Sequence, residues 1–414
     1  MVHYLASLAL LFTTLAALQR SKLGQLSPLK VLCWTWVTAL SAHLALSLNG
    51  GDGVRPLRPY TVLILLTSIY SLIAGYLAVR ALFKNRVKLP PSRIAQANTR
   101  ALTTKVVAVC ATLVFISALS VAKSIGETSL ATLDLRELRA NLNYEGYTWG
   151  LIKYLFMGVY VYGVYSIITR RHAELPVGVL PRYIFAVALL LAALSTQRTS
   201  VFMVIIASYF GLAPRDRGLK VTTVYAGFLL ALFMGIGVAL SKGGDLGLNL
   251  SENLSLGITT ALQYLTSPLS ALDTFLHQHI VNTNGAYTLR FFAAIAQSVG
   301  LAEITPVSLV QPFVNAPFPT NVYTFSHAPF LDYGGMFWGY HFAIGAIMGL
   351  LFCVPNSRPS VITFKAFAYY PIVLSFFQDQ FFTILSSWIQ IALWLYLFDR
   401  VHSLRRLTLA SLRF

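Results

Sequence analysis

Apolar residues occur along the chain in repeated runs of roughly 17–25 positions, the length with which a helix spans the hydrocarbon core of a bilayer. A transmembrane barrel would show alternating segments of about ten residues instead. The pattern therefore predicts an all-α, polytopic integral membrane protein with about eleven transmembrane helices. They are expected near residues 2–18, 30–48, 59–82, 105–122, 150–168, 181–197, 199–213, 221–240, 333–354, 363–378 and 380–398.

Composition supports this prediction. Hydrophobic residues make up 56% of the 414 and charged residues 11%, whereas a soluble domain carries about 25% charged residues. Mean hydropathy is +0.67. The first apolar run has neither a basic leader nor a small-residue cleavage site, so we expect a membrane anchor rather than a cleaved signal peptide.

The net charge of +17 is concentrated in alternate connections. These connections and the C-terminal tail hold 22 of the 31 basic residues but only three of the 14 acidic ones. Such an excess marks the cytoplasmic face, so we expect an N-terminus on the external side, a cytoplasmic C-terminus, multi-pass insertion among membrane lipids, and no nucleic-acid partner.

Three sections follow from the spans. Residues 1–240 carry eight helices and an external loop at 123–149. Residues 241–332 form a large external loop, with an amphipathic stretch near 256–282 that is suited to the membrane interface. Residues 333–414 carry three helices and the tail. The cytoplasmic connections are too short for a nucleotide-binding domain, and no phosphate-binding glycine motif occurs in the required context.

Arginines on the external side are candidate phosphate contacts. Arg198 lies between two adjacent apolar runs, where a charge usually faces a cavity or a partner; the alternative is that it reaches the outer headgroups. Arg290 is one of two basic residues in the large loop, and a structural salt bridge is its alternative role. Arg136 and Arg139 lie three apart, on one face of any helix formed there.

The segment 320–335 holds the densest polar cluster, immediately before a span. His327 and Asp332 are candidate general bases, while Asn321 and Tyr323 are candidate substrate-binding residues. The alternative is that the aromatic residues of this segment belong to the interfacial belt.

Other polar residues give weaker signals. His277 and His279 are poorly spaced for a metal and have no third ligand, and the cysteines Cys33, Cys110 and Cys353 show no zinc spacing. We therefore expect no metal and no cofactor. Asp379 lies between the last two apolar runs. We expect it to cap a helix or to pair with an arginine rather than to act in catalysis.

Several of these segments resemble the Wzy-type oligosaccharide repeat-unit polymerases, the O-antigen polymerases of bacterial inner membranes. The order of features is also similar: an arginine between mid-chain spans, a large loop, and an aspartate–aromatic–glycine entry into the next span, here Asp332, Tyr333 and Gly334. The resemblance covers about residues 195–350. The segments that carry it are Tyr-Leu-Thr-Ser-Pro-Leu-Ser-Ala-Leu-Asp (264–273), Gly-Ala-Tyr-Thr-Leu-Arg-Phe-Phe (285–292) and Thr-Asn-Val-Tyr-Thr-Phe (320–325).

The resemblance implies a GT-C-like fold and a metal-independent, inverting glycosyl transfer at the periplasmic face of the inner membrane. The donor is a glycan chain on undecaprenyl pyrophosphate, and the acceptor is an incoming lipid-linked repeat unit. Arg198 and Arg290 would stabilise the departing pyrophosphate, Arg136 and Arg139 would hold a second one, and Asp332 or His327 would assist deprotonation of the acceptor. A polysaccharide chain-length regulator is the expected protein partner.

Two alternatives remain at this stage. An O-antigen ligase shares the spans, the large loop and the donor but passes the glycan to lipid A core. A transporter or flippase for the same lipid-linked sugar predicts broken helices and charges at mid-membrane, whereas the polar residues here gather at the outer edge.

Overall fold

The structure is a computed structural model, and it is helical almost throughout. It describes residues 2–21, 23–24, 26–49, 53–83, 98–125, 137–138, 141–142, 148–212, 250–278, 282–301, 307–308 and 311–411. Within these ranges, one short antiparallel ladder joins β1 (Val314–Asn315) to β2 (Pro319–Thr320), with Val314 opposite Thr320.

Seven of the helical segments in the described ranges are long and apolar enough to cross a membrane, which supports the prediction of a helical membrane protein. The expected span at 221–240 lies outside the described residues, so the count of eleven remains a prediction. Four of these segments are α1 (Val2–Arg20), α2 (Pro28–Leu48), α3 (Pro59–Phe83) and α6 (Ile152–His172). The others are Thr103–Ile125 within α4 (Asn98–Ile125), His327–Cys353, which ends with α13 (Phe337–Cys353), and Phe382–Val401, which includes most of α16 (Leu385–Ser411).

Further helices lie in the remaining described segments. They are α7 (Val179–Leu194), α8 (Arg198–Leu212), α10 (Leu250–Phe275), α11 (Arg290–Ser298), α12 (His327–Tyr333), α14 (Pro359–Phe367) and α15 (Tyr369–Val373), with 3₁₀ turns η3 (Gly334–Met336) and η4 (Phe382–Ile384). The expected amphipathic stretch at 256–282 coincides largely with α10.

The span expected at 363–378 is divided in two, because α14 ends at Phe367 and α15 begins at Tyr369. Pro371 gives the physical reason. Proline has no N–H to donate, and in an unbroken helix its ring would clash with the carbonyl four residues earlier, which belongs to Phe367. Hydropathy alone does not detect such a break inside an apolar run.

The chain forms two compact units, each assembled from separate stretches. The first comprises Met1–Lys88, Thr259–Pro355 and Tyr369–Ser386. The second comprises Leu89–Ile258, Asn356–Ala368 and Ser387–Phe414. The expected division into 1–240, 241–332 and 333–414 follows the sequence, whereas each unit combines segments from distant parts of it.

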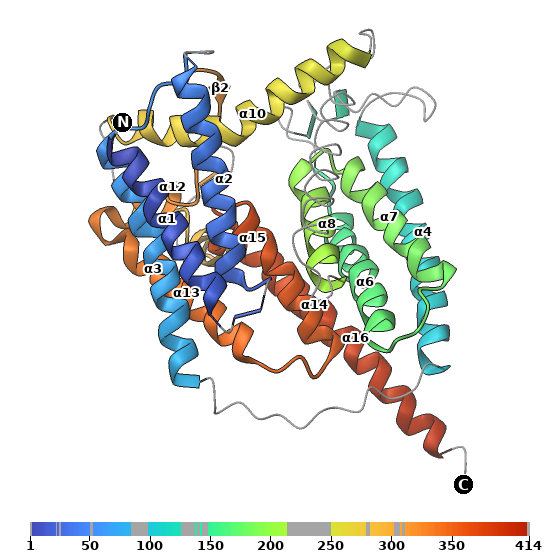
Figure 1. Ribbon diagram of the computed structural model, residues 1–414. Helices are drawn as coiled ribbons and strands as arrows, with labels where there is room; N and C mark the ends of the chain where they lie inside the picture. Colours follow the sequence, from blue (N-terminus) through green and yellow to red (C-terminus); the bar gives the residue numbers. More distant parts are fainter. Residues whose placement is uncertain are drawn as a thin grey trace. The chain divides into compact units, whose positions relative to one another are not determined.

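In the first unit, α3 and α13 lie side by side (Figure 1) and contact each other through backbone atoms. A Cβ added at Gly345 would lie 2.0 Å from the Leu72 carbonyl oxygen, and one at Gly75 would lie 2.0 Å from that of Phe342. One added at Gly349 would lie 2.8 Å from the Tyr76 carbonyl oxygen. Contact positions advance together on both helices, so the helices run parallel. Gly345 and Gly349 form the small-xxx-small pattern that permits such close packing.

Asp273 of α10 ties that helix to the start of α3. Its Oδ1 accepts hydrogen bonds from the Arg58 backbone N–H (2.9 Å) and the Thr61 hydroxyl. A carboxylate at a helix N-terminus is favoured by the helix dipole. The Arg58 guanidinium lies 3.6 Å from Oδ2, but the Arg58 side chain is 51% exposed, so that ion pair contributes little.

Replacing Asp273 by alanine is expected to destabilise the protein by about 1 kcal/mol, the usual value of a lost helix cap. Arg58→Ala is the matched control, because it removes the exposed ion pair and keeps both hydrogen bonds to Oδ1. Thermal unfolding of the purified protein in detergent checks this, and equal destabilisation by the two variants would contradict it.

In the second unit, α6 is buried along most of its length. Gly158 of α6 approaches Trp394 of α16, where a Cβ would lie 2.7 Å from the indole ring. The Asp399 carboxylate of α16 accepts hydrogen bonds from the hydroxyls of Tyr165 and Ser360. This carboxylate therefore links α6, α14 and α16.

Candidate functional site

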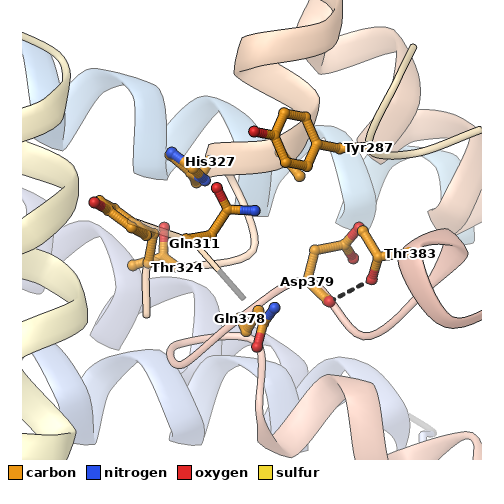
Figure 2. A pocket seen from close by; sticks show the side chains of 9 residues that line it. Tyr287, Gln311, Thr324, His327, Gln378, Asp379 and Thr383 are labelled. Carbon is orange, nitrogen blue, oxygen red and sulfur yellow. Dashed lines mark hydrogen bonds between the residues drawn. The ribbon is translucent and has the colours of Figure 1, made fainter. Parts of the chain in front are cut away.

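A polar pocket lies in the first unit, where the loop before α11, the start of α12 and the turn before η4 meet. It has room for roughly one water molecule. Figure 2 shows side chains from these segments pointing toward one another around this space. The lining residues are Tyr287, Gln311, Tyr323, Thr324, His327, Ala328, Gln378, Asp379 and Thr383.

Asp332 lies beside this pocket but not on its surface, and its side chain is 2% exposed. Oδ1 accepts hydrogen bonds from the Thr283 hydroxyl (2.6 Å) and the Tyr287 backbone N–H (3.2 Å). Oδ2 accepts from the backbone N–H (2.6 Å) and hydroxyl (2.7 Å) of Thr288. Both oxygens are thus occupied in holding the turn at 283–288, which carries Tyr287 into the pocket.

His327 begins α12 and is buried in the pocket wall. Its ring stacks on Tyr323, with centroids 4.1 Å apart and planes 11° apart, and meets the edge of Phe275 at 4.4 Å. The Tyr323 hydroxyl donates to the Pro312 carbonyl oxygen (3.2 Å). Asn321 is half-buried and lies outside the pocket lining. Two candidates, His327 and Tyr323, therefore share one wall.

Asp379 is the carboxylate on the pocket surface, and it is 2% exposed. Oδ2 accepts a hydrogen bond from the Tyr340 hydroxyl (2.8 Å), and Oδ1 accepts one from the Phe381 backbone N–H (3.0 Å). Its backbone carbonyl accepts from Thr383 (2.6 Å), the bond drawn in Figure 2. The bond to Phe381 closes a local turn and does not cap a helix, because η4 begins at Phe382 and has no side-chain cap. The other partner is a tyrosine and not the arginine that was the second expectation.

Burial raises the pKa of Asp379 to about 7, and the neighbouring Asp332 carboxylate adds to the rise, while the bonds from Phe381, Tyr340 and Thr383 oppose it. Burial also raises the pKa of Tyr287 across the pocket, with a further contribution from Asp332. The pocket therefore holds an acid that changes protonation state near neutral pH.

Among the candidate arginines, the structure describes the side chain of Arg290. Arg290 begins α11, and its Nε donates to the Val307 carbonyl oxygen. Its partial burial lowers its pKa. Arg290 does not line the pocket. Arg136 and Arg139 lie outside the described residues.

Arg198 is the first residue of α8 and belongs to the second unit. It follows a tight turn in which Thr196 has φ +57°, a conformation that costs a β-branched residue energy. The backbone is therefore strained two residues before Arg198, where α8 begins. The side chain of Arg198 lies outside the described part of the structure.

The sequence contains a signal for pocket residues that were not among the expected site residues. Gln378, Asp379 and Gln380 form a polar triplet between two pairs of phenylalanines, an unusual composition in an apolar stretch. Gln311, by contrast, is one polar residue in a proline-rich loop, and no local pattern marks it.

Comparison with known proteins adds one relative. The putative O-antigen polymerase of Escherichia coli (strain K12) is 29% identical to this chain over 222 residues. The match covers 52% of this chain and 52% of that protein, so the chain spans about half the length of the curated relative it matches. No protein-family model and no solved structure matches the chain.

Proposed function

We propose that this protein is an oligosaccharide repeat-unit polymerase of the O-antigen type, a glycosyltransferase of the inner membrane. It transfers a glycan chain from undecaprenyl pyrophosphate to a sugar hydroxyl of an incoming lipid-linked repeat unit at the periplasmic face. The reaction is metal-independent and inverting, on a GT-C-like fold. The name of the curated relative supports the class of activity.

One structural observation carries the proposal. Two of the segments that resemble the polymerases, 285–292 and 320–335, lie far apart in the sequence but meet through the hydrogen bonds of Thr288 to Asp332. Both contribute side chains to the same polar pocket. The third such segment, 264–273, ends at Asp273, which ties α10 to α3 in the same unit.

Most of the residue roles follow from the resemblance and from charge, and that of Asp332 follows from its placement. Arg198 stabilises the negative charge that grows on the pyrophosphate as it departs, since guanidinium groups bind phosphate oxygens in a bidentate manner, and Arg290 is the alternative arginine for this role. Arg136 and Arg139 contact the pyrophosphate of the acceptor lipid. Asn321, Tyr323 and His327 contact the sugars. Asp332 acts as a positioning residue, because its four hydrogen bonds fix the turn that carries Tyr287.

The decisive experiment incubates purified protein with lipid-linked repeat units as the sole substrate, with and without a chelator. We expect a ladder of polymer lengths that the chelator does not change. A ligase would give no ladder until lipid A core is added, and a flippase would give no ladder at all.

Arg198→Ala is expected to reduce ladder formation by about 100-fold or more, the usual effect of losing one electrostatic contact to a transition state. Arg182→Ala is the matched control, because Arg182 is exposed at the start of α7 on the expected cytoplasmic side. Normal ladders from Arg198→Ala protein would remove Arg198 from the mechanism.

A further inference from the structure

The two buried carboxylates at the pocket differ in how many hydrogen bonds they accept. Asp332 accepts four, two on each oxygen. Asp379 accepts one on each oxygen, from Phe381 and Tyr340, and the Thr383 backbone N–H also favours its charged form. A carboxylate oxygen can accept two hydrogen bonds. The carboxylate of Asp379 therefore retains capacity for a further donor, while that of Asp332 is saturated.

The two carboxylates also differ in their position relative to the pocket. Asp379 is on the pocket surface, and Asp332 is behind it. A hydroxyl group entering the pocket would meet Asp379 together with the amides of Gln311 and Gln378, which line the same space. Amide groups both donate and accept hydrogen bonds, as recognition of a sugar hydroxyl requires.

We propose that Asp379 is the general base that accepts the proton of the attacking sugar hydroxyl, with Tyr340 as its positioning residue. This inference rests on the proposed function. It assigns the acid–base role within that reaction to a residue outside the segments that resemble the polymerases.

The atoms balance in one displacement step. The acceptor oxygen forms a bond to the anomeric carbon of the donor sugar while its proton moves to the Asp379 carboxylate. The bond from that carbon to the pyrophosphate oxygen breaks, and the bonding electrons leave with undecaprenyl pyrophosphate. Asp379 later returns the proton to water, which restores the charged form for the next transfer.

The electrostatics of the pocket suit this role. Burial raises the pKa of Asp379 to about 7, near the pH at which a base is most effective. The titratable groups around it are Tyr340 as hydrogen-bond donor, Asp332 behind the pocket wall, and His327 and Tyr287 across the pocket. Asp332 opposes the charged form of Asp379, and the Tyr340 hydroxyl favours it.

The protonation state of Asp379 determines how the polymerisation rate depends on pH. The reactive form is the carboxylate, which predominates above a pKa of about 7. Polymerisation rate at low substrate concentration is therefore expected to rise through pH 7 and level off above it. Tyr340→Phe removes a donor that stabilises the charged form, so the midpoint of the rise should move to higher pH.

The test compares Asp379→Asn, Asp379→Glu and Asp399→Asn in the full-length protein, with lipid-linked repeat units as substrate. Asp379→Asn is expected to lose 100-fold or more of the rate, about the contribution of a general base, and to lose the rise through pH 7. Asp379→Glu should recover part of the rate together with a pH-dependent rise. Asp399→Asn is the matched control, because Asp399 is also a carboxylate bound by a tyrosine hydroxyl but lies in the other unit.

The outcomes distinguish failure of the proposed function from failure of the role of Asp379. A wild-type protein that makes no ladder refutes the proposed function itself. In a second outcome, the wild type forms ladders while Asp379→Asn polymerises within threefold of the wild-type rate, with the same rise through pH 7. That result refutes only the role of Asp379, and His327 becomes the candidate base. If Asp379→Asn fails to fold in thermal unfolding, the Asp379→Glu and Tyr340→Phe profiles decide, and a wild-type midpoint in both overturns the inference.

Discussion

Gly345→Ala is expected to prevent stable folding of the first unit, or to lower its stability by about 3 kcal/mol or more, at the upper end of the range for overpacking. The added Cβ would lie 2.0 Å from the Leu72 carbonyl oxygen. That atom belongs to the backbone, so no side-chain rotation relieves the clash and α3 must separate from α13. Loss of monodisperse protein in size-exclusion chromatography and a lower melting temperature would show this.

Gly339→Ala is the matched control for that substitution. It makes the same change on the same helix, α13, but the added Cβ meets nothing within 4 Å. Alanine is favoured over glycine in a helix by roughly 0.5–1 kcal/mol, so this variant should be as stable as the wild type or slightly more. Equal damage from both substitutions would refute close backbone contact as the reason for glycine at position 345.

Asp332→Ala is expected to cost about 3 kcal/mol or more, because it leaves two backbone N–H groups and two hydroxyls without their acceptor, at about 1–3 kcal/mol for each buried group left unsatisfied. The turn at 283–288 would be released, and Tyr287 would leave the pocket wall. We expect a lower melting temperature and faster hydrogen exchange at the amides of Tyr287 and Thr288.

Asn282→Ala serves as the control in the same loop. The Asn282 side chain accepts a hydrogen bond from the Asn284 backbone N–H but is exposed, so water can replace it as acceptor. This variant should unfold close to the wild-type temperature. If Asp332→Ala protein also does, with unchanged exchange at Thr288, then Asp332 does not hold the turn.

The apolar pattern predicted the helices well wherever one run forms one helix. Runs at 2–18, 30–48 and 59–82 became α1, α2 and α3 within a few residues, since burial in a bilayer imposes both helix and length. The pattern did not predict the interruption before Pro371, because a short break leaves the mean hydropathy of the run unchanged.

The site was predictable only in part, because its geometry depends on pairings between distant residues. The polar density of 320–335 drew attention to His327 and Asp332. Whether a carboxylate is free or occupied depends on its donors, and those of Asp332 lie more than 40 residues earlier. Asp379 likewise owes its environment to Tyr340, 39 residues away. No local spacing contains this information.

The close approach of α3 and α13 has a consequence for biosynthesis. The surface of α3 around Gly75 leaves the ribosome about 270 residues before its counterpart at Gly345 of α13, which is on the order of tens of seconds at the usual rate of synthesis. During that interval α3 resides in the membrane with its contact surface facing lipid or an insertion factor. A nascent chain arrested before position 345 should therefore retain an α3 that other helices of the membrane can still contact.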